Sequence, residues 1–180
     1  ENERQSLIVS FQKGEEVIDP TVVGETTNAE ATAFSCQRKL FWYDGLYWLF
    51  YNSGTAIYYR YSADGLAWSD GVRLPDGTTP HSESGFDVAF RNGNVMVGWI
   101  DSSLTVYAIK GTVIGATIQW AGRAEIAQNT LPEYVQSDPV SVAIGFDGSY
   151  WIAYSYNARF ISGPSVTFLK ALVSLSLIHI

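Results

Sequence analysis

The chain has 180 residues, of which 47% are apolar, 14% aromatic and only 16% charged. A disordered segment would be poorer in aromatic side chains and richer in charge, and a long coiled coil would consist mostly of Ala, Glu, Lys, Leu and Arg, so both classes are excluded. The formal net charge of −7 gives no support to binding of nucleic acid or of an anionic membrane surface. No stretch approaches the roughly 20 apolar residues that span a bilayer. We expect about one globular domain, without a nucleic-acid partner and without membrane insertion.

Metal and redox chemistry have little support in the sequence. Cys36 is the only cysteine, and there are two histidines, His81 and His179. A disulfide framework needs several cysteines, and transition metals are held by clustered Cys, His, Asp or Glu side chains. The sequence therefore predicts no metal site and no cofactor.

Short β-type runs follow one another from the start of the chain, and no segment has a convincing helical pattern. The predicted strands are 6–11, 17–23, 31–34, 46–51, 56–61, 68–74, 86–90, 94–99, 105–109, 117–120, 140–144, 149–154 and 165–172.

Three segments repeat one pattern, in which a turn ends in Gly and an aromatic residue follows six positions later. The segments are 44–51, 92–99 and 147–154, and their glycines lie 48 and 55 residues apart. Asp-Gly and Asn-Gly supply the positive φ angles of a tight type I′ hairpin. The run after each turn is apolar nearly throughout, which is typical of a strand covered on both faces.

Four short strands in each repeat of about fifty residues are typical of β-propeller blades. A β-sandwich also has short strands, but it does not predict the repeated turn and aromatic residue. The predicted fold is all-β, a β-propeller fragment of about three to four four-stranded antiparallel blades. The partial propeller covers 1–174, with outer strands of one blade at 6–23, blades at 28–74 and 82–127, and a partial blade at 137–172. Because propellers close with four to eight blades, we expect the chain to be a fragment.

One short motif resembles a known family. The segment Ser62-Ala-Asp64-Gly65-Leu-Ala-Trp68 resembles the Asp-box, or neuraminidase (BNR) repeat, of the sialidase-like propellers, whose pattern is Ser-x-Asp-x-Gly-x-Thr-Trp. This copy has one residue fewer before Trp68, and Ala67 stands where Thr is usual. A shorter form also recurs in five-bladed glycoside hydrolase propellers, so the motif does not choose between these families. We expect Asp64 to accept hydrogen bonds from turn amides, Gly65 to be left-handed, and Trp68 to pack under the turn.

The resemblance implies that this box is structural and distant from any active site. It also implies a secreted or cell-surface protein that acts on glycans. Sialidases hold a substrate carboxylate with three arginines and use a tyrosine nucleophile paired with a glutamate. Here only Arg159 falls at the predicted site end, and no such Tyr–Glu pair can be assigned. The resemblance alone therefore does not establish sialidase chemistry.

The candidate site lies at the end of the predicted blades opposite to the Gly-ended turns. Five of the nine aspartates precede Gly and are most simply turn formers. The polar residues left at the opposite end are Asn28, Glu30, Asn52, Ser53, His81, Glu83, Asp87, Asp101, Ser102, Ser103, Ser137, Asp138, Asn157 and Arg159. Carboxylates, amides and hydroxyls near aromatic strands suit sugar rings, although loop ends are also polar simply because they face water.

A glycosidase uses two carboxyl groups, one as acid and the other as base or nucleophile. The predicted catalytic residues are Asp87, Asp138 and Glu30, and the predicted substrate-binding residues are Glu83, Asp101, Asn157 and Arg159. The apolar neighbours of Asp87 favour the protonated form that a general acid needs. The alternative is that Asp87 caps a backbone amide of the sheet, and Asp138, which precedes Pro139, alternatively starts a turn.

Two functions from different classes follow, and a glycan or glycoconjugate is the expected partner. The first is part of a sialidase-like or related glycoside hydrolase that acts on glycans through these carboxylates. The second is a non-catalytic propeller module that binds a glycan or a protein, as in cell-surface or viral attachment. A structural repeat without a ligand is a third alternative.

The chain ends are expected to be artificial. The chain begins at Glu1, and its only methionine, Met96, lies inside an apolar run, so no signal peptide is visible. The last six residues, Leu-Ser-Leu-Ile-His-Ile at 175–180, resemble the translation of a transposon end that is used to prepare sequencing libraries. We expect 175–180 to be a non-native tail. The alternative is a final strand, because 173–180 partly alternates.

Overall fold

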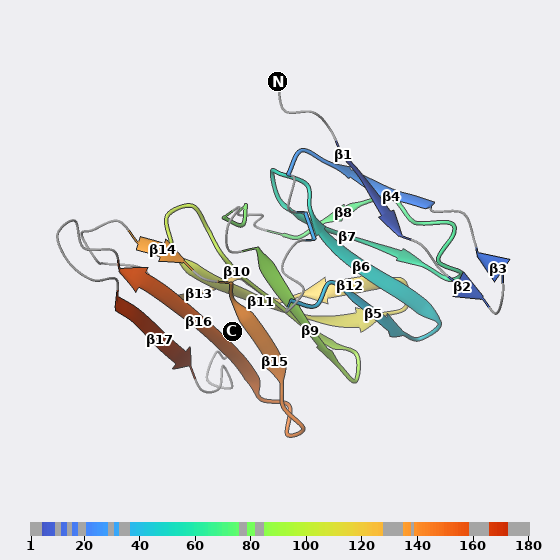
Figure 1. The fold of residues 1–180 in the computed structure, drawn as a ribbon. Coiled ribbons are helices and arrows are strands. Elements are labelled where there is room, and N and C mark those ends of the chain that lie inside the picture. The colour runs from blue at the N-terminus through green and yellow to red at the C-terminus, as the bar shows by residue number, and fades with distance from the viewer. Residues whose placement is uncertain are drawn as a thin grey trace. The chain divides into compact units, whose positions relative to one another are not determined.

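A computed structural model describes residues 5–9, 12–13, 16–17, 21–28, 31–32, 37–75, 79–81, 85–127, 135–137, 139–158 and 166–172 of the chain (Figure 1). These residues form antiparallel β-strands and contain no helix. The prediction of an all-β fold is therefore confirmed. The chain divides into two compact units. Unit 1 comprises Glu1–Thr32 and Lys39–Thr79, and unit 2 comprises Ala33–Arg38 and Pro80–Ile180.

The main sheet of unit 1 has four strands that follow one another in the chain and in space. They are β5 (Leu40–Tyr43), β6 (Leu46–Asn52), β7 (Ile57–Ser62) and β8 (Val72–Arg73). Two further pairs in this unit join β1 (Gln5–Val9) to β4 (Thr21–Thr26) and β2 (Gln12–Lys13) to β3 (Glu16–Val17).

Aromatic rings fill the interior beneath this sheet. Trp48 is fully buried, with ring centroids 6.2 Å from Phe41, 5.9 Å from Tyr59 and 5.5 Å from Tyr61. Phe50 is also fully buried and lies 5.9 Å from the Phe41 ring. Since aromatic side chains bury large apolar areas, this cluster is a major source of stability for unit 1.

Unit 2 contains two larger antiparallel sheets. In the first, β9 (Phe86–Arg91), β10 (Asn94–Ile100) and β11 (Val106–Ile114) pair in order, and β12 (Thr117–Trp120) and β13 (Ala124–Ala127) both pair with β11. In the second, β14 (Val135–Ser137) and β15 (Ser141–Ile144) pair with β16 (Tyr150–Ala158), which also pairs with β17 (Val166–Leu172). The predicted strands at 86–90, 117–120, 140–144 and 165–172 correspond closely to β9, β12, β15 and β17.

The first two Gly-ended turns are the tight hairpins that the sequence predicts. Asp44 and Gly45 have φ angles of 52° and 77°, and Asn92 and Gly93 have φ angles of 48° and 79°. Positive φ at both central residues is what a type I′ turn requires. The turns thereby fix the register of each hairpin, with Tyr43 opposite Leu46 in the first of them.

The third turn is different, and the prediction of a type I′ hairpin there was wrong. Five residues, 145–149, join β15 to β16, because Ile144 pairs with Tyr150. Gly148 has a φ of 82°, but Asp147 is not among the residues with positive φ. Oδ1 of Asp147 instead accepts hydrogen bonds from the N–H and the hydroxyl of Ser149, at 3.0 and 2.6 Å, which closes a wider loop.

Burial of the run after each turn also differs between the three segments. Along β10 every residue from Val95 to Ile100 is buried, so this strand is covered on both faces as predicted, and β6 is similar from Trp48 onward. In β16, however, buried Ile152 and Tyr154 alternate with exposed Trp151 and Ala153. The prediction of two covered faces is therefore wrong for the described part of β16. Trp48, Met96 and Trp151 belong to three separate sheets.

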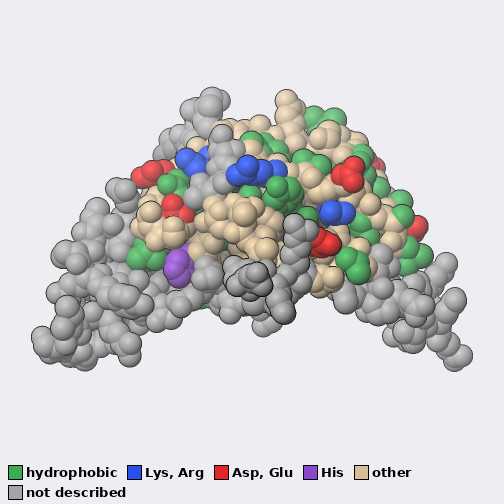
Figure 2. Space-filling model, turned by 90° about the horizontal axis from the view of Figure 1, so that it is seen from above, with side chains coloured by type: hydrophobic (Ala, Val, Ile, Leu, Met, Phe, Trp, Pro, Cys, Tyr) green, Lys and Arg blue, Asp and Glu red, His purple; other side chains and the backbone are tan. Residues whose placement is uncertain are grey.

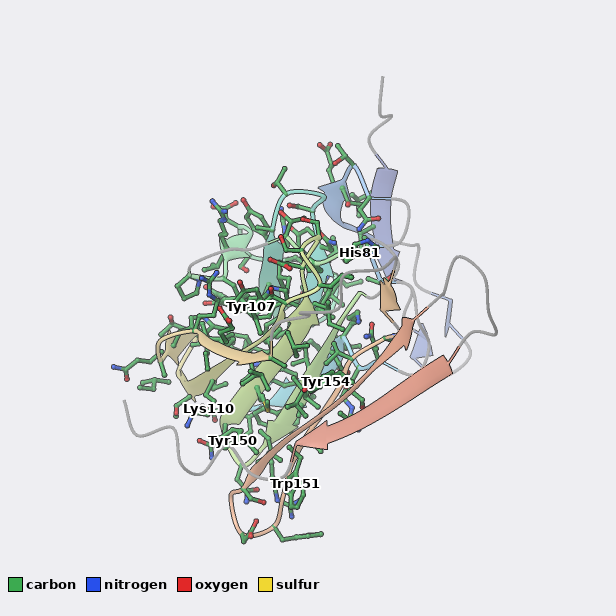
Figure 3. The ribbon with its side chains drawn as sticks, turned by 90° about the vertical axis from the view of Figure 1, so that its left-hand side faces the viewer. His81, Tyr107, Lys110, Tyr150, Trp151 and Tyr154 are labelled. Carbon is green, nitrogen blue, oxygen red and sulfur yellow. The ribbon has the colours of Figure 1, made fainter. Side chains whose placement is uncertain are left out.

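The two sheets of unit 2 share a hydrophobic core, to which Met96, Val142, Ile152 and Tyr154 belong. Gly98 allows the close approach, because a Cβ there would meet Cγ1 of Val142 at 2.5 Å. At the edge of this core, Nζ of Lys110 lies 4.9 Å from the Tyr150 ring centroid (Figure 3). Burial raises the pKa of the Tyr150 hydroxyl above its ordinary value.

Two predicted strands were misplaced. The described part of the run at 31–34 is not a strand, since Ala31 and Thr32 form a turn, and β6 pairs instead with β5, which begins at Leu40. The type I′ turn explains the correct position, because it pairs the four residues directly before Asp44 with β6. The strand predicted at 68–74 is shorter, since only the two residues of β8 pair with β7. The proposed tail at 175–180 lies outside the described residues.

Candidate functional site

Asp87 is the predicted catalytic residue that the structure describes most fully. It lies near the start of β9 and is 4% exposed. Its Oδ1 accepts the backbone N–H of Arg38 at 2.6 Å and that of Val88 at 2.9 Å. Its Oδ2 accepts the N–H of Val142 at 2.8 Å and the hydroxyl of Ser141 at 3.3 Å.

These contacts join three segments of unit 2 that are distant in the sequence. Asp87 connects residue 38, β9 and β15 through one carboxylate. Nearby, Nε2 of Gln37 donates to the carbonyl oxygen of Val140 at 2.8 Å, and the N–H of Val88 is 3.2 Å from the Arg38 carbonyl oxygen. A buried carboxylate with four donors holds backbone amides that would otherwise lack partners. The contacts thus support the interpretation of Asp87 as a cap for sheet amides.

Asp101, predicted to bind substrate, holds the turn between β10 and β11. Its Oδ1 accepts the N–H of Ser103 at 2.9 Å and that of Thr105 at 3.0 Å. Leu104 lies inside this turn with a φ of 61°, a conformation that is uncommon for a residue other than Gly. Asp101 as a whole is 8% exposed, and its Oδ1 binds backbone amides of its own turn.

The remaining predicted residues are described only in part or not at all. Asn157 lies in β16, opposite Gln136 and Thr167, but its side chain is outside the described atoms. Glu30, Glu83, Asp138 and Arg159 lie outside the described residues. Asp87 is therefore the only predicted catalytic carboxylate among the described residues.

The loop after β7 has the local contacts expected from its sequence. Oδ1 of Asp64 accepts the N–H of Leu66 at 2.8 Å and that of Ala67 at 2.9 Å, and it also accepts the Ser62 hydroxyl at 3.0 Å. Gly65 has a φ of 77°, and Nε1 of Trp68 donates to the Gly65 carbonyl oxygen at 3.0 Å. Asp64 therefore organises a turn.

This turn predicts a measurable pH dependence. Hydrogen bonds from the amides of Ala67 and Leu66 and from the Ser62 hydroxyl hold the pKa of Asp64 below its ordinary value of 3.8. A group whose pKa is lowered by folding stabilises the folded state above its unfolded pKa, and this contribution is lost as pH falls through the folded pKa. In urea unfolding from pH 7 to about pH 2, wild type should exceed Asp64→Asn in stability at neutral pH. The difference should shrink below about pH 4. A difference that is constant with pH would contradict this role.

Unit 1 contains an open groove of about 560 Å³ where β4 passes the turn between β6 and β7. Among the residues that line it are Thr27, Tyr51, Ser53, Thr55, Tyr58 and Arg60. Thr27, Ser53 and Thr55 place hydroxyl groups along one rim, with Oγ of Ser53 3.1 Å from Oγ1 of Thr55. Thr27 and Thr55 are exposed, and the Thr27 hydroxyl donates to the Ser53 carbonyl oxygen at 3.3 Å.

Two stacked tyrosines belong to the same groove. The rings of Tyr51 and Tyr58 lie 5.9 Å apart with an interplanar angle of 26°. Tyr51 is 4% exposed, whereas Tyr58 is half-buried and offers more ring surface. Gly24 and Gly71 leave room for the Tyr51 ring, since a Cβ on them would lie 3.1 Å from its Cζ and 2.9 Å from its Oη.

Arg60 completes this arrangement with a fixed positive charge. Its Nε lies 3.4 Å from the Tyr51 hydroxyl, and its Nη1 donates to the Ser69 carbonyl oxygen at 3.0 Å. The groove therefore combines an aromatic wall, three hydroxyls on the rim, the acidic residue Glu25 and a positioned guanidinium. This combination can hold a polar ligand that also has an apolar face.

Sequence reasoning did not single out Tyr51, Tyr58 or Arg60. Tyr51 is the aromatic residue six positions after Gly45, and the repeat pattern placed it in the core. Only Ser53, among the rim residues, was placed at the predicted site end. Gly24 and Gly71 both lie against the Tyr51 ring and would have indicated the groove, but they come together only in the folded chain.

Neither a charged patch on the face drawn in Figure 2 nor metal binding offers a further candidate site among the described residues. On the face drawn in Figure 2, Lys and Arg side chains lie in separate small groups, with Asp and Glu among them. Among the described residues, no group of three or more His, Cys, Asp or Glu is placed to hold a metal ion. The described residues include no helix that could span a membrane.

Comparisons with family models, with curated proteins and with solved structures found no match.

Proposed function

We propose that the chain is part of a β-propeller and that the groove of unit 1 binds a glycan. The propeller is supported by three antiparallel sheets that each contain a hairpin with one of the Gly-ended turns, whose glycines lie 48 and 55 residues apart. In each of the first two, chain order and spatial order agree over four strands, as in an up-and-down blade.

One observation carries the binding function, namely the partly exposed Tyr58 ring beside the hydroxyls of Thr27, Ser53 and Thr55. A sugar ring has an apolar C–H face that stacks on an aromatic ring, and hydroxyls that exchange hydrogen bonds with polar neighbours. The volume of about 560 Å³ lies within the range of small-molecule sites. Arg60, held by Tyr51 and Ser69, adds charged donors to the same wall.

Binding is proposed ahead of hydrolysis because of the carboxylates. A glycosidase needs two carboxyl groups that face the scissile bond. Asp87 and Asp101 are the two candidates whose side chains are described, and both accept backbone amides. Glycan hydrolysis through Glu30, Glu83 or Asp138 is the alternative that the experiment below separates from binding.

The test uses the full chain on a panel of immobilised oligosaccharides, together with an assay of chromogenic glycosides. We expect saturable binding to at least one glycan, and about tenfold weaker binding by Tyr58→Ala, because one ring-stacking contact is lost. Tyr107→Ala is the matched control, since Tyr107 stacks on Trp99 as Tyr58 stacks on Tyr51 but lies in unit 2.

Two results would contradict the proposal. One is the absence of binding to any glycan by folded wild type, and the other is equal binding by wild type and Tyr58→Ala. Glycoside turnover that survives Asp87→Asn would instead establish the hydrolase alternative with other carboxylates.

A further inference from the structure

Unit 2 has a second groove, of about 360 Å³, between β9 and β15. Residues along it include Arg38, Asp87, Ala89, Arg91, Ser141 and Ile144. Side chains two apart on a strand share a face, so Asp87, Ala89 and Arg91 lie on one side of β9. The hydrogen bonds of Asp87 to β15 and the place of Ala89 in the shared core show that this side faces β15.

Arg91 lies at the opposite end of this face from Asp87. Its guanidinium carbon is 3.6 Å from the centroid of the Phe146 ring, in the loop that follows β15. Its Nε is buried and makes no hydrogen bond. A guanidinium that stacks through its face on an aromatic ring keeps its N–H edge available for a ligand.

The carboxylates near this groove are already engaged. Both oxygens of Asp87 accept the four donors described above. Oδ1 of Asp147, one residue after Phe146, accepts the N–H and hydroxyl of Ser149. Arg38 also lines the groove, so its lining residues carry two positive charges against the one negative charge of Asp87.

We propose that this groove is a second binding site, which takes an oxyanion group through the edge of the Arg91 guanidinium. Two parallel N–H···O bonds suit a carboxylate, a sulfate or a phosphate group, and such charge-assisted pairs are stronger than neutral hydrogen bonds. Phe146 orients the guanidinium, and Ala89 supplies the space beside it. The site is independent of the glycan groove, because it lies in the other unit and uses different residues.

The test titrates the full chain with acetate, sulfate and phosphate at constant ionic strength and follows the arginine Nε–H signals by NMR. A saturable shift of the Arg91 signal is expected with at least one anion, and the ranking of the three anions distinguishes planar from tetrahedral groups. Arg91→Gln should weaken binding by at least about tenfold, because a charge-assisted hydrogen-bonded contact is lost. Arg91→Lys should bind at an intermediate level, since it keeps the charge but loses the fork.

Arg123→Gln is the matched control, because Arg123 also stacks on an aromatic ring of unit 2, at 4.5 Å from the Tyr107 centroid, but does not line the groove. Phe146→Leu keeps the charge and should also weaken binding, which separates the site from a general charge effect. Equal anion affinity of wild type and Arg91→Gln would overturn the proposal, as would equal losses in Arg91→Gln and Arg123→Gln or the absence of saturable shifts. Tyr58→Ala should leave anion binding unchanged, so this test and the glycan test fail separately.

Discussion

Asp87→Asn is expected to lower the free energy of unfolding by about 3–5 kcal/mol, although it removes only one charge. An asparagine can still accept the amides of Arg38 and Val88 through its oxygen. Its NH₂ group then faces the N–H of Val142, where Oδ2 accepts a 2.8 Å hydrogen bond in the wild type. Two donors would face each other in a buried place, and the link between β9 and β15 would be lost. Guanidinium unfolding followed by tryptophan fluorescence measures this change.

Asp70→Asn is the control for the loss of one negative charge. Asp70 is exposed, and its side chain makes no hydrogen bond among the described residues. Its substitution should change stability by no more than about 0.5 kcal/mol. If Asp87→Asn unfolded at the same denaturant concentration as Asp70→Asn, the structural role of Asp87 would be refuted. A stable Asp87→Asn protein that loses glycoside turnover would instead support catalysis by this residue.

Trp48→Ala should have a comparable effect, a loss of about 3–5 kcal/mol, through a different cause. Trp48 is fully buried, and its ring contacts Phe41, Tyr59 and Tyr61. Truncation to alanine removes the apolar surface that Trp48 buries on folding, and it leaves a cavity that the rigid neighbouring rings fill poorly. Thermal unfolding monitored by near-UV circular dichroism would show both the lower midpoint and the lost aromatic packing.

Trp42→Ala provides the comparison within the same sheet. Trp42 is 60% exposed in β5, so its truncation forms no enclosed cavity. A loss below about 1 kcal/mol is expected for it. Similar losses for the two variants would show that the described burial of Trp48 is incorrect.

The local pattern predicted most of the strands because hairpin chemistry is a short-range property. Asp44-Gly45 and Asn92-Gly93 require only that two adjacent residues tolerate positive φ, and both turns form as expected. Asp147-Gly148 has the same two residue types as Asp44-Gly45 but lies in a five-residue loop, since the Ser149 N–H and hydroxyl bind Asp147 Oδ1. The sequence offers no rule for choosing between these two geometries when a hydroxyl residue follows the Gly.

The environment of each candidate residue depends on contacts between segments far apart in the sequence. The sequence leaves Asp87 as either an acid or a cap, because its partners, Arg38, Ser141 and Val142, lie about fifty residues away on either side. The groove of unit 1 has the same character, because β4 and the β6–β7 turn come together only in the folded chain. Glycines that admit an aromatic ring, such as Gly24 beside Tyr51, are recognised from three-dimensional proximity.

The glycan site is tested most directly by an amide NMR titration of the ¹⁵N-labelled chain with an oligosaccharide selected from the panel. We expect the shift changes to concentrate on Thr27, Ser53, Thr55 and Tyr58 in unit 1. The amides of β9 and β15 should not respond. Shift changes confined to β9, β15 or the Asp101 turn would contradict the assignment of the glycan site. They would show that the carbohydrate binds near Asp87 or Asp101 instead.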